Sequence, residues 1–571
     1  LRGLDGSLTS SADASINSVA VGKGANSVAG NTVLGESALD ASVSGGNNTA
    51  IGLEALTSMT SGTQNTAVGR LSLTTLTTGG SNTAIGSLAL YQATTGSNNV
   101  GVGYNALGTN STASNNTAVG YSSLAANTTA SNNTAIGNLA LTSNTTGHSN
   151  VAVGANALDA NTTAQNNTAV GLSSLGANTT GTANTGLGSK SLEDTTTGSN
   201  NTGIGYQALE SNTTGTQNVS VGSGALFANT TASNNTAVGF LALEANTSGD
   251  ELVAVGRGAL GANTTANHNT AIGTSSFAAN TTGTNNTGCG YNSGATNTTG
   301  GNNTAIGDFA LNANTTANNN TAVGYAALLS NTTGASNTAV GAEAMDAATT
   351  AHSSVCIGSE SGGAITTGVN NTAVGHQALD ATTTSSFNVA VGSGALGANT
   401  ESAQTAVGHN ALHNVTTGHS NVAVGTDAGD VLTTGINNVI LGRSAQPSSA
   451  TVSNEVVLGS SSISALRCNT QTISALSDAR DKTNVTDLPQ GLDFITKLRP
   501  VKFKWASRDG NGKDGSYEHG FIAQDLQTAQ KENDADYLNM VLNENPDRLE
   551  ASYGKLVPIL TKAIQELSAK V

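Results

Sequence analysis

The sequence predicts a mainly β protein: an elongated repeat β-solenoid or β-roll shaft built of 17-residue coils, followed by a small α+β domain that ends in a coiled-coil helix. Three observations carry this prediction. The composition is polar and rich in small residues, with 70 glycines, 3% aromatic and only 10% charged residues. A glycine-centred pattern recurs every 17 residues, and the density of charged residues changes sharply near residue 476.

The repeat is marked by the tetrapeptide TAVG, TAIG or a close variant. Its glycine stands at 35, 52, 69 and every 17th position up to 392, then at 408, 425, 442 and 459 after one 16-residue step. The residue before this marker glycine is always apolar, and the residue four places after it is Leu in 19 of 27 repeats when Gly22 is included. Two apolar positions per coil cannot make a conventional core, but stacked parallel strands about 4.8 Å apart turn them into ladders.

We expect one apolar ladder to lie inside each coil and the other to face neighbouring chains on a three-fold axis, which predicts a homotrimer. Asn and Thr share the same phase, as in Asn115–Asn116–Thr117, and stacked amides can hydrogen-bond along such a ladder. The marker glycine fits a corner that needs positive φ or close backbone approach. An α-solenoid is the rival architecture, but Thr, Asn and Gly are poor helix formers.

Charge, hydropathy and cysteine usage argue against several function classes. The 20 basic and 36 acidic residues give a net charge of -16, which argues against nucleic acid as a partner. The sequence contains no run of about 18 apolar residues and therefore predicts no membrane-spanning helix. Cys289, Cys356 and Cys468 lack the short spacing of a disulfide framework or metal site, and we expect no cofactor. Cys289 and Cys356 fall in the strand of their repeats, where we interpret them as small apolar fillers.

The shaft offers few candidates for chemistry. A polysaccharide-cleaving spike needs two carboxylates that face one another across a groove. The adjacent acidic pairs are Glu193–Asp194 and Asp250–Glu251. Adjacent residues on a strand point to opposite faces, so the two carboxylates of a pair cannot face one another, and we interpret them as solvated. Five tyrosines follow a marker glycine and could stack on sugars, although corner packing is the simpler interpretation: Tyr104, Tyr121, Tyr206, Tyr291 and Tyr325.

Charge density places the domain boundaries. Residues 1–476 contain 28 charged side chains, whereas the 95 residues from 477 to 571 contain another 28. We expect an N-terminal connector over 1–18, the repeat shaft over 19–460, a linker over 461–476 and a compact α+β domain over 477–571. In this domain we expect helices over 491–498 and 521–531 and a strand over 501–505. The closing segment has apolar spacings of three and four, which predict a coiled-coil seam through Leu556, Leu560, Ala563 and Leu567, with Val557 and Ile564 beside it.

Three motifs follow one another in the last domain: SDARDKTNV at 477–485, LRPVKFKW at 498–505 with HGFIAQD at 519–525, and LVPILTKAIQEL at 556–567. In this order they resemble the C-terminal intramolecular chaperone of phage endosialidase tailspikes and tail fibres, a self-cleaving serine–lysine peptidase family. The shaft repeats are similar to the stacked coils in the heads of trimeric autotransporter adhesins. The resemblance implies that Ser477 is the nucleophile, that Lys482 is its base and that the Leu476–Ser477 bond is cleaved.

The chemistry of a serine–lysine pair is consistent with that implication. A serine hydroxyl is a poor nucleophile until a base removes its proton, and lysine can be that base once burial favours its neutral form. A spacing of five would put the two side chains on different helix faces, so Ser477 should precede a helix. The alternative is an Asp or Ser helix cap followed by a solvated lysine.

The sequence therefore predicts a trimeric viral tail-fibre or tailspike shaft for host attachment, located in the virion tail. Its C-terminal domain is expected to nucleate trimerisation and register and then to release itself in a single turnover. The expected partners are two further copies of the chain and a host-cell surface receptor or glycan. The alternative is a bacterial trimeric adhesin or surface filament on the cell surface. A glycan-degrading tailspike is a third interpretation, which lacks the paired carboxylates.

Overall fold

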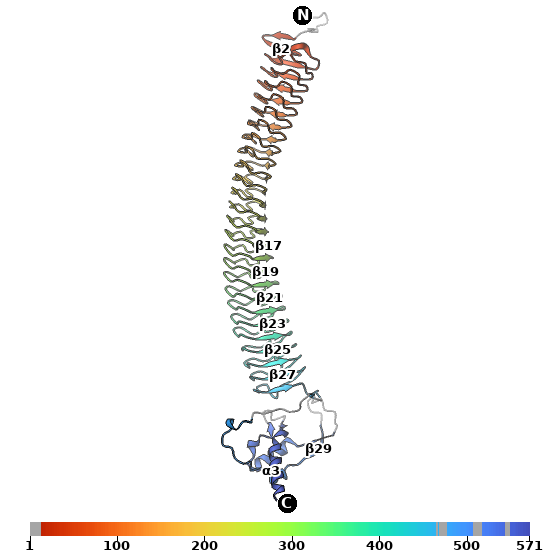
Figure 1. Cartoon of the computed structure of the whole chain (residues 1–571), viewed down its shortest axis with the longest axis vertical. Helices are drawn as coiled ribbons and strands as arrows, with labels where there is room; N and C mark the ends of the chain where they lie inside the picture. Colours follow the sequence, from red (N-terminus) through yellow and green to blue (C-terminus); the bar gives the residue numbers. More distant parts are fainter. Residues whose placement is uncertain (1–12, 464–465, 468–476, 506–516, 543–548) are drawn as a thin grey trace. The chain divides into compact units, whose positions relative to one another are not determined.

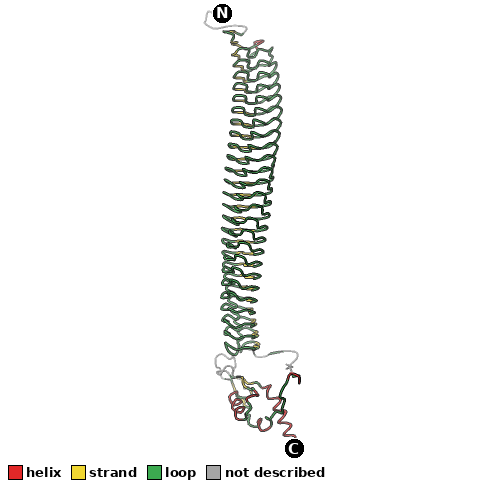
Figure 2. The backbone as a smooth tube through the Cα atoms, turned by 90° about the vertical axis from the view of Figure 1, so that its left-hand side faces the viewer, coloured by secondary structure: helices red, strands yellow, loops and turns green. Residues whose placement is uncertain are grey.

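A computed structural model of the chain describes residues 13–463, 466–467, 477–505, 517–542 and 549–571. The chain divides into two compact units, Leu1–Asn337 and Thr338–Val571, which we describe one after the other. As predicted, the fold is mainly β and is built of 17-residue coils, each with one short strand (Figure 1). The rest of each coil is turn and loop (Figure 2).

In the first unit, from Thr32 onward, each strand pairs in parallel with the strand one coil away, so that Thr49 lies opposite Thr66. The parallel strands of this unit are β3 (Thr32–Gly35), β4 (Thr49–Ile51), β5 (Thr66–Val68), β6 (Thr83–Ile85), β7 (Val100–Val102), β8 (Thr117–Val119), β9 (Thr134–Ile136), β10 (Val151–Val153), β11 (Thr168–Val170), β12 (Thr185–Leu187), β13 (Thr202–Ile204), β14 (Val219–Val221), β15 (Thr236–Val238), β16 (Val253–Val255), β17 (Thr270–Ile272), β18 (Thr287–Cys289), β19 (Thr304–Ile306) and β20 (Thr321–Val323).

The first repeat differs from the others. Strands β1 (Ala14–Ile16) and β2 (Val19–Gly22) pair antiparallel, and β2 also runs antiparallel to β3, with the short helix η1 (Ala25–Ser27) between them. The marker glycines Gly22 and Gly35 are 13 residues apart instead of 17. The chain therefore reverses direction here, and parallel stacking begins at β3.

The second unit continues the coil pattern and then forms a small domain. Its parallel strands are β21 (Thr338–Val340), β22 (Val355–Ile357), β23 (Thr372–Val374), β24 (Val389–Val391), β25 (Thr405–Val407), β26 (Val422–Val424), β27 (Val439–Leu441) and β28 (Val456–Leu458). The 16-residue step lies between β24 and β25, where Gln404 takes a slot that most coils fill with Asn. Its longer side chain still accepts a hydrogen bond from the backbone N–H of Asn421 at 3.0 Å.

Each coil has a thin apolar core. The Leu four places after the marker glycine is fully buried, as at Leu56 and Leu107, whereas the Val or Ile before the glycine lies on the outer face, as at Ile136. One ladder therefore lies inside and the other outside, as predicted. The middle residue of the strand is also buried, and it is small because it packs on Leu: a Cβ added at Gly101 would lie 3.4 Å from Leu90 Cγ.

Two ladders of buried asparagine run beside the apolar core, which confirms the predicted amide stacking. In the first, Asn133 N–H donates to Asn116 Oδ1 at 2.9 Å, and Asn116 Nδ2 donates to the Ala130 carbonyl at 2.9 Å. In the second, Asn127 Nδ2 donates to Asn110 Oδ1 at 2.8 Å. These bonds satisfy polar groups that would otherwise cost free energy inside a narrow coil.

Tight corners explain the marker glycine. Gly52 has a φ of +129°, and a Cβ on it would lie 2.7 Å from the carbonyl carbon of Gly69 in the next coil, so only glycine fits. The buried Leu56 also has a left-handed backbone, with a φ of 54°. Such a conformation is strained for leucine, so the coil holds it there by burying the side chain completely.

The two described cysteines occupy different environments. Cys356 takes the buried middle slot of its strand, and burial raises the pKa of its thiol to about 12. Cys289 takes the slot before the marker glycine, and its side chain is exposed. Its interpretation as an apolar filler is therefore wrong, because that slot faces outward. Cys468 lies outside the described residues.

The domain after the coils is α+β, as predicted. Its elements are η2 (Ala479–Asp481), α1 (Leu492–Ile495), β29 (Val501–Lys504), β30 (Tyr517–Gly520), α2 (Ala523–Glu532), η3 (Asp536–Leu538), β31 (Val541–Leu542), β32 (Glu550–Ala551), η4 (Tyr553–Lys555) and α3 (Leu556–Ser568). Strands β29 and β30 pair antiparallel, as do β31 and β32. Phe494, Leu526, Met540 and Ile559 lie in one buried cluster that joins α1, α2 and α3.

Candidate functional site

The predicted nucleophile and base lie on either side of a single helical turn. The carboxylate of Asp478 caps this turn, η2, by accepting a hydrogen bond from Arg480 N–H at 2.9 Å. The same carboxylate pairs with the Arg480 guanidinium, and these bonds hold the pKa of Asp478 below its ordinary value. The turn brings Lys482 back toward Ser477, so that Lys482 Nζ donates to Ser477 Oγ at 2.6 Å. Ser477 precedes the turn, as the spacing predicts.

The helix cap with a solvated lysine and the serine–lysine contact, which the sequence offers as alternatives, occur together in this segment. Asp478 is a helix cap, and Lys482 is exposed, as the alternative interpretation expects. Lys482 also contacts the Ser477 hydroxyl, which is the contact that a serine–lysine pair needs. In the isolated chain both side chains are exposed, so a base made from Lys482 would need a further surface to bury it. Leu476, on the other side of the predicted cleavage site, lies outside the described residues.

Helix α3 carries two apolar faces. Leu556, Ile559 and Ala563 are buried in the domain's own core. A second set is exposed and is spaced three, four and three residues apart: Val557, Leu560, Ile564 and Leu567. The predicted seam mixed the two faces, because Leu556 and Ala563 pack inside the domain while Val557 and Ile564 belong to the exposed seam. A seam with this spacing matches the heptad pattern that packs against other helices.

One anchoring residue was not predicted. Helix α1 begins after Gly491, which has no side chain to cap it. Glu566, from α3, supplies the missing acceptor: the N–H of Leu492 donates to Glu566 Oε2 at 2.7 Å. Glu566 also lies 3.6 Å from Lys562 Nζ. The only signal in the sequence was a glycine where a capping side chain is expected, and it could not indicate a partner 74 residues away.

The acidic pairs of the shaft serve as structural partners. Glu193 pairs with Lys190 at 2.9 Å. Asp250 Oδ1 accepts a hydrogen bond from the N–H of Ser233 at 2.6 Å, and Glu251 lies 3.2 Å from His268 Nε2. Glu193, Asp250 and Glu251 therefore each face a donor of their own. Within the described residues, no cluster of three or more His, Cys, Asp or Glu is arranged to hold a metal ion, and no helix is both long and apolar enough to span a membrane.

The tyrosines after the marker glycine pack on one another in part. Tyr104 and Tyr121 stack with ring centroids 5.5 Å apart and an interplanar angle of 13°. Tyr291 meets Phe309 edge to face at 5.3 Å, and Phe309 meets Tyr325 at 6.4 Å. This is the corner packing that the sequence suggests, although all five tyrosines, Tyr206 included, remain about half exposed.

Comparison with known proteins finds a family match in the C-terminal segment. Residues 477–534 match the family described as chaperone of endosialidase, a peptidase family, and the match begins at Ser477 and contains Lys482. No curated protein and no solved structure shows significant similarity to the chain. The match implies a self-cleaving chaperone domain. An endosialidase-type chaperone segment that follows β-solenoid coils fits a tail fibre or tailspike with a C-terminal chaperone.

Proposed function

We propose that the protein is the shaft of a homotrimeric viral tail fibre or tailspike that serves in host attachment and belongs to the virion tail. Residues 19–460 form the shaft, and residues 477–571 form a chaperone that brings three chains together. This domain then releases itself by cleaving the Leu476–Ser477 bond. The observation that carries the proposal is the family match at 477–534, which begins at the serine that Lys482 contacts at 2.6 Å.

The proposed reaction uses the serine and the lysine in turn. Lys482, in its neutral form, takes the proton from Ser477 Oγ, and the oxygen attacks the carbonyl carbon of Leu476. The peptide bond to the Ser477 nitrogen breaks as Lys482 returns the proton to that nitrogen, and an ester joins Leu476 to Ser477 Oγ. Water then hydrolyses the ester, which frees the carboxylate of Leu476 and restores the Ser477 hydroxyl. Burial is what favours a neutral lysine, and Lys482 is exposed in the single chain. We therefore infer that assembly buries Lys482 and that cleavage follows trimerisation.

Two exposed apolar surfaces support association of three chains. The seam of α3 exposes Val557, Leu560, Ile564 and Leu567 at heptad spacing. The coils expose the Val or Ile before each marker glycine, for example 40% of Ile136 and 43% of Ile272. Contiguous exposed apolar surface on a soluble protein marks an interaction site. Packing these surfaces on a three-fold axis would remove both from water.

Near-identical coils give the domain a reason to trimerise first. Chains of such coils can associate out of register by one coil and still place Val or Ile opposite Val or Ile. Register is weakly specified in repetitive strands, and parallel pairing is slow. A C-terminal domain that assembles three chains before the coils dock would set their register. Its later release would leave the shaft as the mature fibre.

The cleavage is tested by substituting the two residues separately. Ser477→Ala removes the nucleophile and Lys482→Ala removes the base, so each variant should stay full length and still trimerise. Lys531→Ala is the matched control, since Lys531 is an exposed lysine on α2 away from the proposed pair. It should be cleaved like the wild type. Denaturing electrophoresis of freshly expressed protein decides the outcome, and a Ser477→Ala chain cleaved at the wild-type rate would refute the mechanism.

A further inference from the structure

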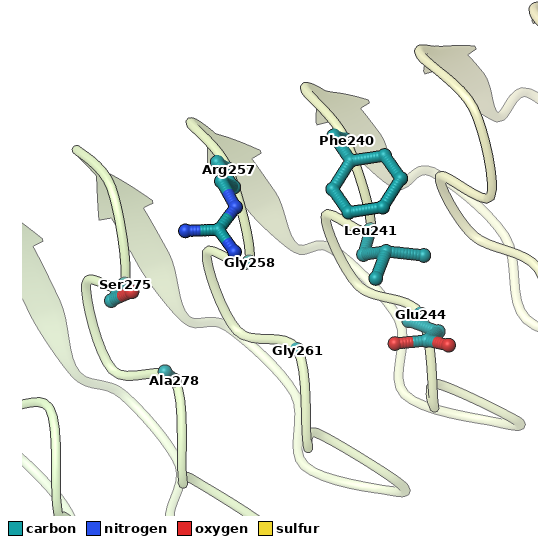
Figure 3. Close-up of a pocket in the computed structure, with 8 residues that line it drawn as sticks. All are labelled: Phe240, Leu241, Glu244, Arg257, Gly258, Gly261, Ser275 and Ala278. Carbon is teal, nitrogen blue, oxygen red and sulfur yellow. The ribbon is translucent and has the colours of Figure 1, made fainter.

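A hollow of about 210 Å³ opens on the corner of the coils between residues 240 and 278. It spans three successive coils, and its lining residues are Phe240, Leu241, Glu244, Arg257, Gly258, Gly261, Ser275 and Ala278 (Figure 3). We propose that this hollow binds a single pyranose ring that carries a carboxylate. The inference rests on the proposed attachment function, to which it adds a place and a chemical class for the ligand.

The hollow exists because small residues coincide in two neighbouring coils. Gly258 stands two places after its marker glycine, and a Cβ on it would meet no atom within 4 Å. At the equivalent Gly224, by contrast, the side chain of Leu241 in the next coil covers the space, since a Cβ there would lie 2.7 Å from Leu241 Cδ2. The residue that follows Gly258 in this row is Ser275, which is too short to cover it.

A second coil with the same pair of glycines is filled. Gly394 and Gly397 take the positions of Gly258 and Gly261, but a Cβ on Gly397 would lie 2.7 Å from the His413 ring. His413 Nδ1 is 2.8 Å from the Gly394 carbonyl, which fixes the ring over the glycines. Two glycines alone therefore do not make an open hollow. At Gly258 the next coil leaves the space empty.

The side chains around the hollow suit a charged sugar. Phe240 is 49% exposed, so an apolar face of a sugar ring can pack on its aromatic ring. Arg257 follows in the same row one coil later, and Figure 3 shows its guanidinium on the same side of the coils as the Phe240 ring. A guanidinium binds a carboxylate through two parallel hydrogen bonds, which a neutral sugar cannot offer.

The charged groups at the hollow are available to a ligand. In the part of the chain that the structure describes, neither the Arg257 guanidinium nor the Glu244 carboxylate has an ion pair or a side-chain hydrogen bond. Both side chains are exposed. Glu244 can accept hydrogen bonds from sugar hydroxyls, and Ser275 Oγ can donate or accept one. The volume is below that of sites for drug-sized ligands, which limits the ligand to about one ring.

The test measures binding of two matched probes, methyl β-glucuronide and methyl β-glucoside, to the assembled full-length protein at physiological ionic strength. Titration followed by ligand-observed NMR should show saturable binding of the glucuronide with a Kd of roughly millimolar order, and weaker binding of the glucoside. Arg257→Ala should weaken glucuronide binding by about tenfold or more and remove the preference. Arg70→Ala is the control, because Arg70 takes the same slot in a coil where Leu71 replaces the glycine.

Filling the hollow gives a second variant that should fold. Gly258→Leu introduces a residue that the chain already uses in this row with the same backbone, as at Leu241 with a φ of 54°. It should abolish binding of both sugars. Equal affinity for the two probes, no saturable glucuronide binding, or glucuronide binding unchanged in Gly258→Leu would each overturn the proposal. Trimer mass and self-cleavage are measured on the same samples, so a failure of the site is distinguished from a failure of the proposed function.

Discussion

At the residue scale, the buried asparagines carry much of the stability of a coil. Asn116→Ala leaves the N–H of Asn133 without its acceptor, which is Asn116 Oδ1 at 2.9 Å. A buried unsatisfied donor costs about 1–3 kcal/mol, so the free energy of unfolding should fall by that amount. Asn115→Ser is the control, because Asn115 is exposed and other coils use Ser in this slot, as at Ser149. Chemical denaturation of both variants checks the difference, and equal losses would contradict the ladder's role.

Half-buried carboxylates make the coils sensitive to pH. Burial raises the pKa of Asp159, Asp346 and Asp380, while hydrogen bonds from the backbone oppose the shift at Asp159. A carboxyl whose pKa is higher in the folded state than in the unfolded state stabilises the fold at pH values below its unfolded-state pKa. This contribution is lost as the pH rises through the folded-state pKa. Asp159→Asn should therefore raise Tm at pH 7, and its advantage should shrink as pH falls toward about 4. An advantage that does not change between these two pH values would contradict the burial argument.

The sequence predicts some of these residue environments and not others. The repeat fixes the phase of Asn115 and Asn116, because every coil must place equivalent residues above one another. It does not reveal that only the second of the pair lies inside. That choice follows from the left-handed backbone at Asn115, with a φ of 61°, which turns its side chain outward. The outward orientation of Cys289 was missed because the repeat does not show which of its two apolar slots is the inner one.

At the element scale, helix α3 separates folding from association. Ile564 is 66% exposed, so Ile564→Glu should leave the domain folded and shift trimers toward monomers, because a charge in a heptad seam has no partner there. Gln565→Glu adds the same charge one residue away from the seam and should keep the trimer. Sedimentation analysis distinguishes these results. Trimers of Ile564→Glu at wild-type stability would show that the seam is not the contact.

The sequence alone does not show which apolar residues of α3 face the core. Spacings of three and four locate the helix correctly but fit two overlapping sets of apolar residues. Leu556 and Ala563 pack in the core, whereas Val557 and Ile564 do not, and the difference depends on how α3 lies against α1. The bond from Leu492 N–H to Glu566 sets that contact. No local pattern encodes it, because its two residues come from opposite ends of the domain.

At the scale of the whole molecule, the coils should depend on the domain that follows them. A chain truncated after residue 470 retains the Val and Ile ladder but lacks the helix proposed to assemble it. It should aggregate on expression, since exposed parallel strands pair slowly and without a fixed register. Soluble yield and light scattering provide the measurement. Correctly aligned soluble trimers at the yield of the full chain would remove the proposed role of residues 477–571.

Native mass spectrometry of the freshly expressed wild-type chain tests assembly and self-release together, because one spectrum reports both association and cleavage. We predict a trimer of chains ending at Leu476 and a separate fragment of 95 residues that begins at Ser477. Ser477→Ala measured beside it should give a trimer of intact 571-residue chains. A wild-type protein that remains an intact chain of 571 residues, or that is cleaved but monomeric, would contradict the account.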